Sequence, residues 1–257
     1  MLENKKQKLY LVLCGIFLTN AITAEIIGAK IFSLSDTLGL NIQSFSFFGM
    51  DMGFALSAGT LNWPIVFVVS DVINEYFGKK GVKFISYLTA ILICFSFLVI
   101  YLAVNVKPAA FWLDANATDT MGNNININEG FKMIFRQGMG IIIGSVIAFL
   151  FGQILDAFVF HKLRNISKNK YVWLRATGST VVSQLIDSFV VIFIAFYVFG
   201  NWTMSQVSQV GLNNYLYKFL VAIALTPLIY LAHYLIDRWL GKELSNDLIS
   251  KATLEKN

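Results

Sequence analysis

The sequence predicts an all-α integral membrane protein with six transmembrane helices and both termini in the cytoplasm. Of its 257 residues, 56% are hydrophobic and 14% are charged, and the mean hydropathy of +0.65 lies outside the range of soluble domains. Apolar stretches long enough to cross about 30 Å of hydrocarbon recur along the chain. They predict one membrane domain over residues 1–257, with helices at 9–32, 55–77, 82–106, 134–160, 173–200 and 215–240.

The distribution of basic residues predicts how these helices are oriented in the membrane. Cytoplasmic loops of membrane proteins are enriched in Lys and Arg, and 15 of the 20 basic residues lie in the two terminal flanks and in the second-third and fourth-fifth connections. The net charge of +5 therefore reflects membrane orientation. Binding to nucleic acid is not expected, because the basic residues are dispersed over four segments and form no single patch.

The first helix follows lysines, as a signal peptide would, but its apolar run is longer than the 7 to 15 residues of a signal sequence. We therefore expect it to remain in the mature protein. Asn20 is a candidate substrate-binding residue in its outer half. Lys30, near Glu25 at the outer end, is either a gating or proton-coupling residue or half of an interfacial ion pair.

The second helix carries a proline and two carboxylates. Pro64 predicts a kink or break in the outer half, because proline removes a helix hydrogen bond. Asp71 lies about 12 Å inside the basic flank along the helix axis, and Glu75 about 6 Å. We interpret Asp71 as a binding or gating residue, Glu75 as a gating or coupling residue and Trp63 as an aromatic surface for a planar ligand.

The third helix offers no chemistry of its own. Cys94 lies within it and Cys14 within the first helix, without the spacing of metal ligands. The sequence therefore predicts no metal site and no cofactor.

The fourth helix carries small residues at every fourth position, which lets another helix approach closely. They are Gly140, Gly144, Ala148 and Gly152. Asp156 continues the stripe. It is either a gating or proton-coupling residue, or a side chain that simply reaches water at the inner face.

The fifth helix carries a polar stripe, formed by Thr177, Thr180, Gln184, Asp187 and Ser188. A charge at the bilayer centre costs roughly 2.5 to 3.5 kcal/mol. The presence of Asp187 therefore favours the interpretation of this stripe as a substrate or ion site over simple hydrogen bonding between helices. The pattern Gln-x-x-Asp occurs here and also at Gln153 and Asp156. An amide both donates and accepts while a carboxylate accepts, which suits the carbonyl and N–H edge of a guanine-like ring. In the sixth helix we expect His233 to form an interhelical hydrogen bond.

Three motifs in order carry a resemblance to a known family. The run from Trp63 to Gly78 resembles the P-x-x-F-x-x-x-D-x-x-x-E-x-x-G signature of the queuosine precursor transporters. The stretch from Gly152 to Arg164 is similar to the G-Q-x-x-D element of that family, and the stretch from Ser179 to Ser188 to its fifth helix. The resemblance implies a bacterial inner-membrane carrier that imports a 7-deazaguanine, namely 7-cyano-7-deazaguanine, 7-aminomethyl-7-deazaguanine or queuine.

The working hypothesis is therefore a secondary carrier for a purine-like base, without enzymatic activity. Asp187 would accept from the ring N–H groups, and Gln184 and Gln153 would address the carbonyl edge. The alternative is the substrate-binding subunit of a multi-subunit ATP-driven vitamin importer, because the sequence contains no nucleotide-binding loop. The expected partners are the base and the lipid bilayer, and the sequence leaves the coupling ion and a homodimer open.

Overall fold

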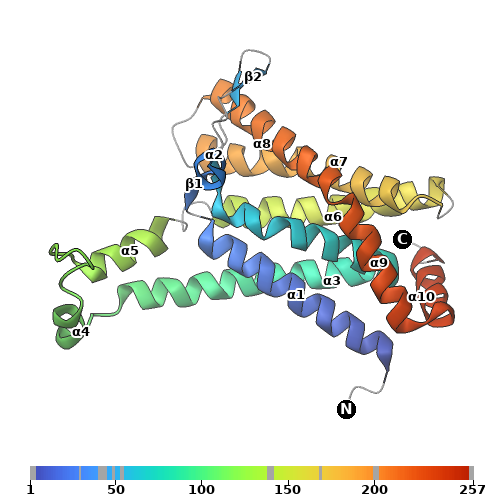
Figure 1. Ribbon diagram of the computed structural model, residues 1–257, viewed down its shortest axis with the longest axis horizontal. Coiled ribbons are helices and arrows are strands. Elements are labelled where there is room, and N and C mark those ends of the chain that lie inside the picture. The colour runs from blue at the N-terminus through green and yellow to red at the C-terminus, as the bar shows by residue number, and fades with distance from the viewer. Residues whose placement is uncertain are drawn as a thin grey trace.

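The computed structural model describes residues 4–28, 30–39, 45–47, 50–52, 55–137, 142–167, 170–198 and 203–254. The protein is mostly helical, and its long helices lie side by side along the long axis (Figure 1). In chain order the elements are α1 (Lys5–Ile27), β1 (Ile31–Ser33), α2 (Leu34–Leu38), β2 (Phe45–Phe47), β3 (Met50–Met52), β4 (Ala55–Ser57), η1 (Ala58–Leu61), α3 (Trp63–Asn105), α4 (Ala110–Ala115), α5 (Ile127–Gln137), α6 (Ile142–Ile166), α7 (Val172–Ile192), η2 (Phe193–Val198), α8 (Met204–Ala224), α9 (Thr226–Leu240) and α10 (Lys242–Leu254).

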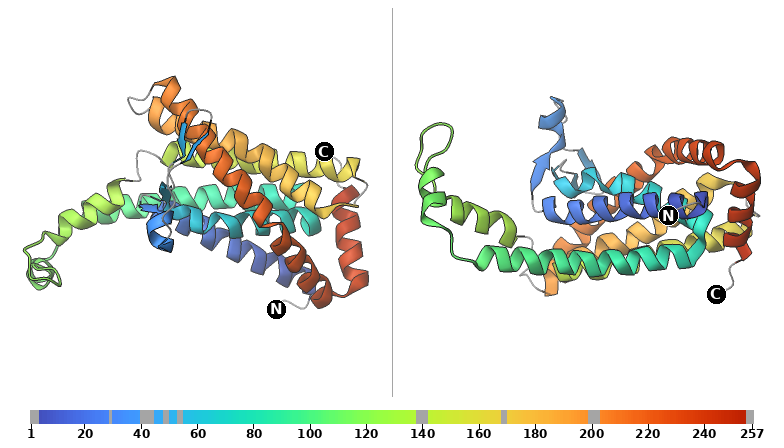
Figure 2. Two further views of the ribbon diagram at one scale, coloured as in Figure 1. Left: turned by 45° about the horizontal axis from the view of Figure 1, so that its top comes forward. Right: turned by 90° about the horizontal axis from the view of Figure 1, so that it is seen from below.

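The element α3 consists of two helical arms, residues 63–77 and 79–105, which meet at Gly78. The backbone there has φ 68° and ψ −170°, a conformation open essentially to glycine alone. A Cβ built on Gly81 would lie 3.4 Å from Ile73 Cγ2, whereas a straight helix would separate these positions by about 12 Å. The chain therefore reverses at Gly78, and the two arms run back along each other (Figures 1 and 2).

The predicted kink at Pro64 is wrong. The helix begins at Trp63, after the N-cap residue Asn62, so that Pro64 occupies its first turn. Proline is well tolerated there because a first-turn N–H has no partner inside the helix. The preceding residues form the strand β4 and the turn η1, so the helix starts eight residues later than the predicted range 55–77.

Two long connections contain short elements of their own. Strand β1 pairs with β4, and β2 pairs with β3, both antiparallel. The Asn-rich connection between the third and fourth predicted helices contains α4 and α5, which lie at the end of the molecule opposite α10 (Figure 1). These elements add short strands and helices to an otherwise helical membrane fold.

Several helices can cross a membrane by length and composition. Within the described residues they are Lys5–Ile27, Trp63–Asn105 and Val146–Ile166. A fourth candidate is the pair Tyr215–Ala224 and Thr226–Leu240, whose axes bend by 43° at the break between them. The chain is therefore a multi-pass membrane protein.

The core lies where α1, α3 and α6 pack together. Phe17 and Ala21 of α1 are fully buried with Val66 and Ile73 of α3, and Tyr10 donates to the carbonyl oxygen of Gly81 over 2.9 Å. The outward faces instead carry large exposed apolar side chains, among them Leu11, Phe84, Ile91, Phe95, Leu98 and Leu231. Soluble monomers rarely expose so much apolar surface, so these faces fit a lipid environment.

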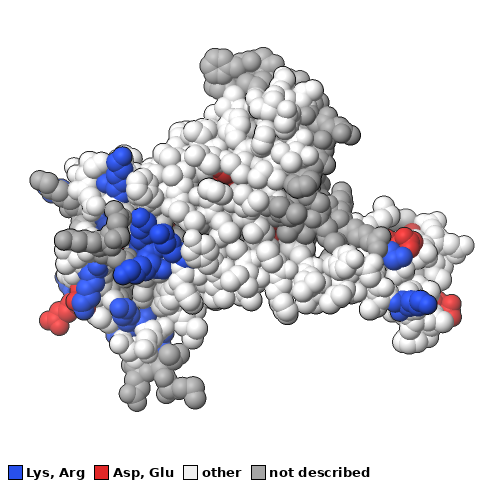
Figure 3. All heavy atoms as spheres, turned by 180° about the vertical axis from the view of Figure 1, so that it is seen from behind, with Lys and Arg blue, Asp and Glu red and all other residues white. Residues whose placement is uncertain are grey.

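Basic residues gather at the end of the molecule that carries α10 (Figure 3). Two hydrogen bonds bring the basic flanks together at this end. Lys5 Nζ donates to the carbonyl oxygen of Trp239 over 2.7 Å, so α1 begins where α9 ends. Arg164, near the end of α6, donates to the carbonyl oxygen of Ile249 in α10 over 3.0 Å. We call this end of the molecule the basic end.

Candidate functional site

A layer of buried polar side chains lies between the first arm of α3, α6 and α7. Its members recur at three- or four-residue spacing, which places them on one face of each helix. Each is at most 6% exposed, and they are Ser70, Asp71, Asn74, Gln153, Asp156, Ser179, Thr180, Ser183, Gln184 and Ser188. We call this group the polar layer. Burying polar groups is costly unless they are hydrogen-bonded, so their partners decide what the layer can do.

Some of these groups bond across the helix interfaces. Ser70 Oγ donates to Gln153 Oε1 over 3.1 Å. The Asp156 carboxylate accepts from Asn74 Nδ2 and from Ser183 Oγ, each over 3.3 Å. These bonds join α3, α6 and α7, and they provide Asp156 with donors for its negative charge.

Other polar atoms of the layer lack a partner. Within the described residues, five buried oxygen atoms have no hydrogen-bond partner: both Asp71 carboxylate oxygens, Asn74 Oδ1, Gln184 Oε1 and Ser188 Oγ. Buried polar atoms are nearly always paired, and an unpaired one costs about 1 to 3 kcal/mol. All five can accept a hydrogen bond, so a ligand rich in N–H donors or carrying a positive charge would complement them.

Asp187 lies at the edge of the polar layer. Its Oδ2 is 2.5 Å from Lys218 Nζ of α8, and the two side chains are 15% and 21% exposed. A Cβ on Gly152 would lie 3.5 Å from Asp187 Cβ, so α6 and α7 are in close contact here. The carboxylate that the sequence places at the centre of substrate recognition therefore has an internal counter-ion.

Glu75 lies one turn from Asp71, toward the basic end, within a buried charge cluster. Arg175 of α7 binds it through two hydrogen bonds, Nε to Oε2 over 2.8 Å and Nη2 to Oε1 over 2.6 Å. Arg164 of α6 approaches the same carboxylate within 3.5 Å. Arg164 also donates to the carbonyl oxygens of Asn74 and Glu75. We call Glu75, Arg164 and Arg175 the charge clamp, since together they fasten α3 to α6 and α7.

A second connection lies beside the charge clamp. Tyr76 donates to Asp237 Oδ1 over 2.6 Å and lies 3.2 Å from His233 Nδ1. Ser245 of α10 donates to the same carboxylate oxygen over 2.5 Å. The prediction of an interhelical hydrogen bond for His233 is confirmed.

Three predicted site residues lie outside the polar layer. Asn20 donates to the carbonyl oxygen of Ile16 in its own helix. Trp63 packs against Phe67 at 5.8 Å and Phe149 at 6.0 Å between ring centroids. Lys30 lies beyond the end of α1 with an exposed side chain. The structure therefore does not bring Asn20 and Lys30 into the layer, and Trp63 stands about 12 Å from Asp71 along α3.

The small-residue stripe of α6 faces the protein interior. Gly144, Ala148 and Gly152 are buried, whereas Gly140 falls outside the described residues. Because α6 packs along both α3 and α7, these small side chains lie in the part of the bundle that holds the polar layer.

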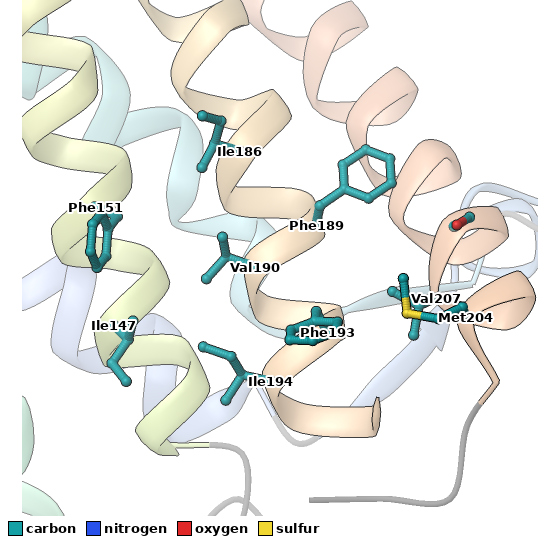
Figure 4. A pocket seen from close by; sticks show the side chains of 10 residues that line it. Ile147, Phe151, Ile186, Phe189, Val190, Phe193, Ile194, Met204 and Val207 are labelled. Carbon is teal, nitrogen blue, oxygen red and sulfur yellow. The ribbon is translucent and has the colours of Figure 1, made fainter. Parts of the chain in front are cut away.

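One large cavity is an apolar groove outside the polar layer. It has a volume of about 590 Å³ and lies between α6, α7 and α8 (Figure 4). Its walls include Phe151, Phe189 and Phe193. Such a surface offers nothing to a polar base, so the chemistry points to the polar layer instead. Among the described residues, no three His, Cys, Asp or Glu side chains cluster as metal ligands.

The sequence analysis gave no role to Lys218, Arg164 and Arg175, which pair with the carboxylates of Asp187 and Glu75. The two arginines are 0% and 2% exposed. A signal was available for two of the three, because carboxylates inside predicted helices need nearby counter-ions, and Arg175 and Lys218 lie inside the predicted helices 173–200 and 215–240.

A multi-pass helical fold with a buried polar layer and unpaired acceptors fits a membrane transporter. The family described as "Putative vitamin uptake transporter" matches residues 57–232, and the chain belongs to this family. It is 29% identical over 188 residues to the "Probable queuosine precursor transporter" of Bacillus subtilis (strain 168), covering 72% of this chain and 74% of that protein.

Two further relatives have similar names. The "Probable queuosine precursor transporter" of Haemophilus influenzae is 28% identical over 176 residues, 68% of this chain and 67% of that protein. The "Queuosine precursor transporter" of Escherichia coli (strain K12) is 26% identical over 200 residues, 77% of this chain and 82% of that protein. No solved structure matches the chain significantly. The family resemblance seen in the three sequence motifs is confirmed.

Proposed function

We propose that this protein is a carrier that imports a 7-deazaguanine precursor of queuosine across the bacterial inner membrane. The observation that carries the proposal is the unpaired carboxylate of Asp71, 2% exposed, within a layer of further unpaired acceptors. The three relatives named queuosine precursor transporters support the substrate class.

The edge of a guanine-like ring complements these atoms. It presents two neighbouring N–H donor groups beside a carbonyl oxygen. A carboxylate can accept both donors at once, and charge-assisted hydrogen bonds of this kind are the strong ones. Asp71 is the better candidate for this contact, because the carboxylate of Asp187 is already paired with Lys218.

The amides of Gln153 and Gln184 would address the carbonyl side of the ring. Ser70 donates to Gln153 Oε1, which leaves the amide nitrogen of Gln153 to donate. In this arrangement Asp187 stays at the edge of the site, and Trp63 lines the path to it from the end opposite the charge clamp.

The proposed topology has six crossings, with both termini in the cytoplasm. The six membrane-crossing segments would be α1, the first arm of α3, the second arm of α3, α6, α7 together with η2, and α8 together with α9. Basic residues gather at the end of the bundle where α1 begins and α9 ends (Figure 3). Positive charge favours the cytoplasmic side, so this end would face the cell interior and α4 and α5 would lie outside.

Uptake of labelled 7-deazaguanines tests the proposal, in a strain that lacks both its own synthesis and its own transporter and expresses this chain alone. We expect Asp71→Asn to lower affinity roughly 5- to 150-fold, since losing a charge-assisted bond costs about 1 to 3 kcal/mol. Asp247→Asn, on the exposed face of α10, is the matched control and should transport normally.

Two results would count against the proposal. Uptake only in the presence of an added ATPase module would favour the binding subunit of an ATP-driven importer. Wild-type affinity in a folded Asp71→Asn protein would remove Asp71 from the substrate site.

A further inference from the structure

The polar layer contains two carboxylates and no cation. Asp71 and Asp156 are both almost fully buried, and they lie within electrostatic range of each other. Asn74 connects them, because it stands one turn from Asp71 on α3 and donates to Asp156. Burying two negative charges together is strongly unfavourable without compensation.

The neighbouring cations are engaged with other carboxylates. Arg164 and Arg175 both bind Glu75 in the charge clamp. Lys218 binds Asp187 on the other side of the layer. Asp237 accepts hydrogen bonds from the hydroxyl groups of Tyr76 and Ser245. It lies beside His233, farther toward the basic end. None of these groups forms a hydrogen bond to the Asp71 carboxylate within the described residues.

The two carboxylates differ in their surroundings. Asp156 has donors from Asn74 and Ser183, so it can carry a negative charge. Asp71 has none, and Asn74 Oδ1, Gln184 Oε1 and Ser188 Oγ are further buried oxygens without partners in the described part of the chain. Carboxylate, amide and hydroxyl oxygens are the ligands that hard cations prefer.

We propose that Asp71, together with Asp156 and the oxygens around them, binds one positive charge during transport. This inference rests on the proposed function and extends it, because a 7-deazaguanine ring is itself neutral. The charge comes from one of two sources. It is either a co-transported monovalent cation, H⁺ or Na⁺, or the ammonium group of a base with an aminomethyl side chain. The ammonium group lies across the ring from the two N–H donors, so Asp156 would bind it while Asp71 accepts from those donors.

The experiment uses purified full-length protein reconstituted in liposomes. Uptake of 7-cyano-7-deazaguanine, which is neutral, is measured under an inward H⁺ gradient, an inward Na⁺ gradient or neither. Stimulation by one gradient identifies the co-transported ion. If neither gradient acts, competition between the cyano and aminomethyl bases tests the second source, and the aminomethyl base should bind about tenfold tighter or more. The gradient effect should vanish in Asp71→Asn and the preference for the aminomethyl base in Asp156→Asn, and both should persist in Asp247→Asn.

Measurements made in the absence of any 7-deazaguanine separate this inference from the proposed function. Infrared difference spectra of wild type and Asp71→Asn report whether a buried carboxyl carries a proton, and melting temperatures in NaCl against choline chloride report Na⁺ binding. If no 7-deazaguanine is taken up but either signal is present, the proposed function fails and the cation site stands. If wild-type protein shows no gradient effect, no preference for the aminomethyl base and neither base-free signal, the inference is overturned, whether or not Asp71→Asn folds.

Discussion

Removing the Glu75 carboxylate should destabilise the protein more than removing either arginine that binds it. The three side chains of the charge clamp are at most 2% exposed. Breaking a buried ion pair by removing one partner costs about 3 to 5 kcal/mol, because the remaining charge loses its counter-ion. Arg175→Met leaves Glu75 with Arg164 at 3.5 Å, so we expect the lower end of this range. Glu75→Ala leaves two buried guanidinium groups without a carboxylate, so we expect the upper end.

Thermal unfolding of the purified protein in detergent measures the effect. A loss of about 3 kcal/mol corresponds to at least about 6 °C in a protein of this size. The double variant Glu75→Gln with Arg175→Met should recover part of the loss, because it removes one charge of each sign. The control is Lys251→Ala, whose ion pair with Asp247 is 2.7 Å long but whose side chain is 67% exposed. Such a surface pair is worth only about 0.3 to 0.5 kcal/mol.

The order of the variants is the decisive result. If Glu75→Ala melts at the same temperature as Lys251→Ala, the charge clamp does not hold the helices together. If Arg175→Met is more damaging than Glu75→Ala, Arg164 does not share the carboxylate as its 3.5 Å separation indicates.

Two glycines give further predictions for the same unfolding measurement. Gly152→Ala should be tolerated because its Cβ would lie 3.5 Å from Asp187, an ordinary contact. Gly152→Leu should cost about 1 to 3 kcal/mol through overpacking, and equal stability of the two variants would contradict the close contact of α6 and α7. Gly78→Ala should cost about 1 to 3 kcal/mol because its φ of 68° and ψ of −170° strain any other residue. Gly15→Ala is its control, since a Cβ on this helical residue meets nothing within 4 Å, and the change should stabilise the helix by up to about 1 kcal/mol. A Gly78→Ala protein as stable as Gly15→Ala would exclude the sharp reversal.

The apolar pattern was sufficient to predict a mostly helical multi-pass fold but not where every helix begins and ends. The reversal at Gly78 falls between the predicted second and third helices, because the apolar run breaks there and glycine can adopt the required backbone angles. The role of Pro64 depended on where the helix starts. Residues before it form strand β4, which pairs with β1. The spacing of apolar residues in the sequence does not predict such a long-range pairing.

Chemistry within one helix was easier to predict than contacts between helices. The spacing of Gln153 and Asp156 placed both on the face that enters the polar layer, and both are buried. The counter-ions could not be derived in this way. Glu75 and Arg175 are 100 positions apart, so their contact depends on how the helices pack. Asp187 looked more exceptional than Asp71 for the same reason, since nothing in the spacing revealed Lys218 as its partner.

The sequence of side chains along α3 explains how such a site can be closed on both sides. Phe67, Asp71 and Glu75 follow at four-residue intervals and share one helix face. On the side of Phe67, aromatic rings of α3 and α6 pack against one another. On the side of Glu75, the charge clamp joins α3 to α6 and α7. An aromatic pair contributes about 0.5 to 1.5 kcal/mol beyond its area, whereas breaking a buried ion pair costs about 3 to 5 kcal/mol. We therefore expect the aromatic side to open more readily than the basic end. In the proposed importer, with its basic end in the cytoplasm, the polar layer would then be accessible from outside at rest. It would open inward only when bound substrate offsets the cost of separating Glu75 from its arginines.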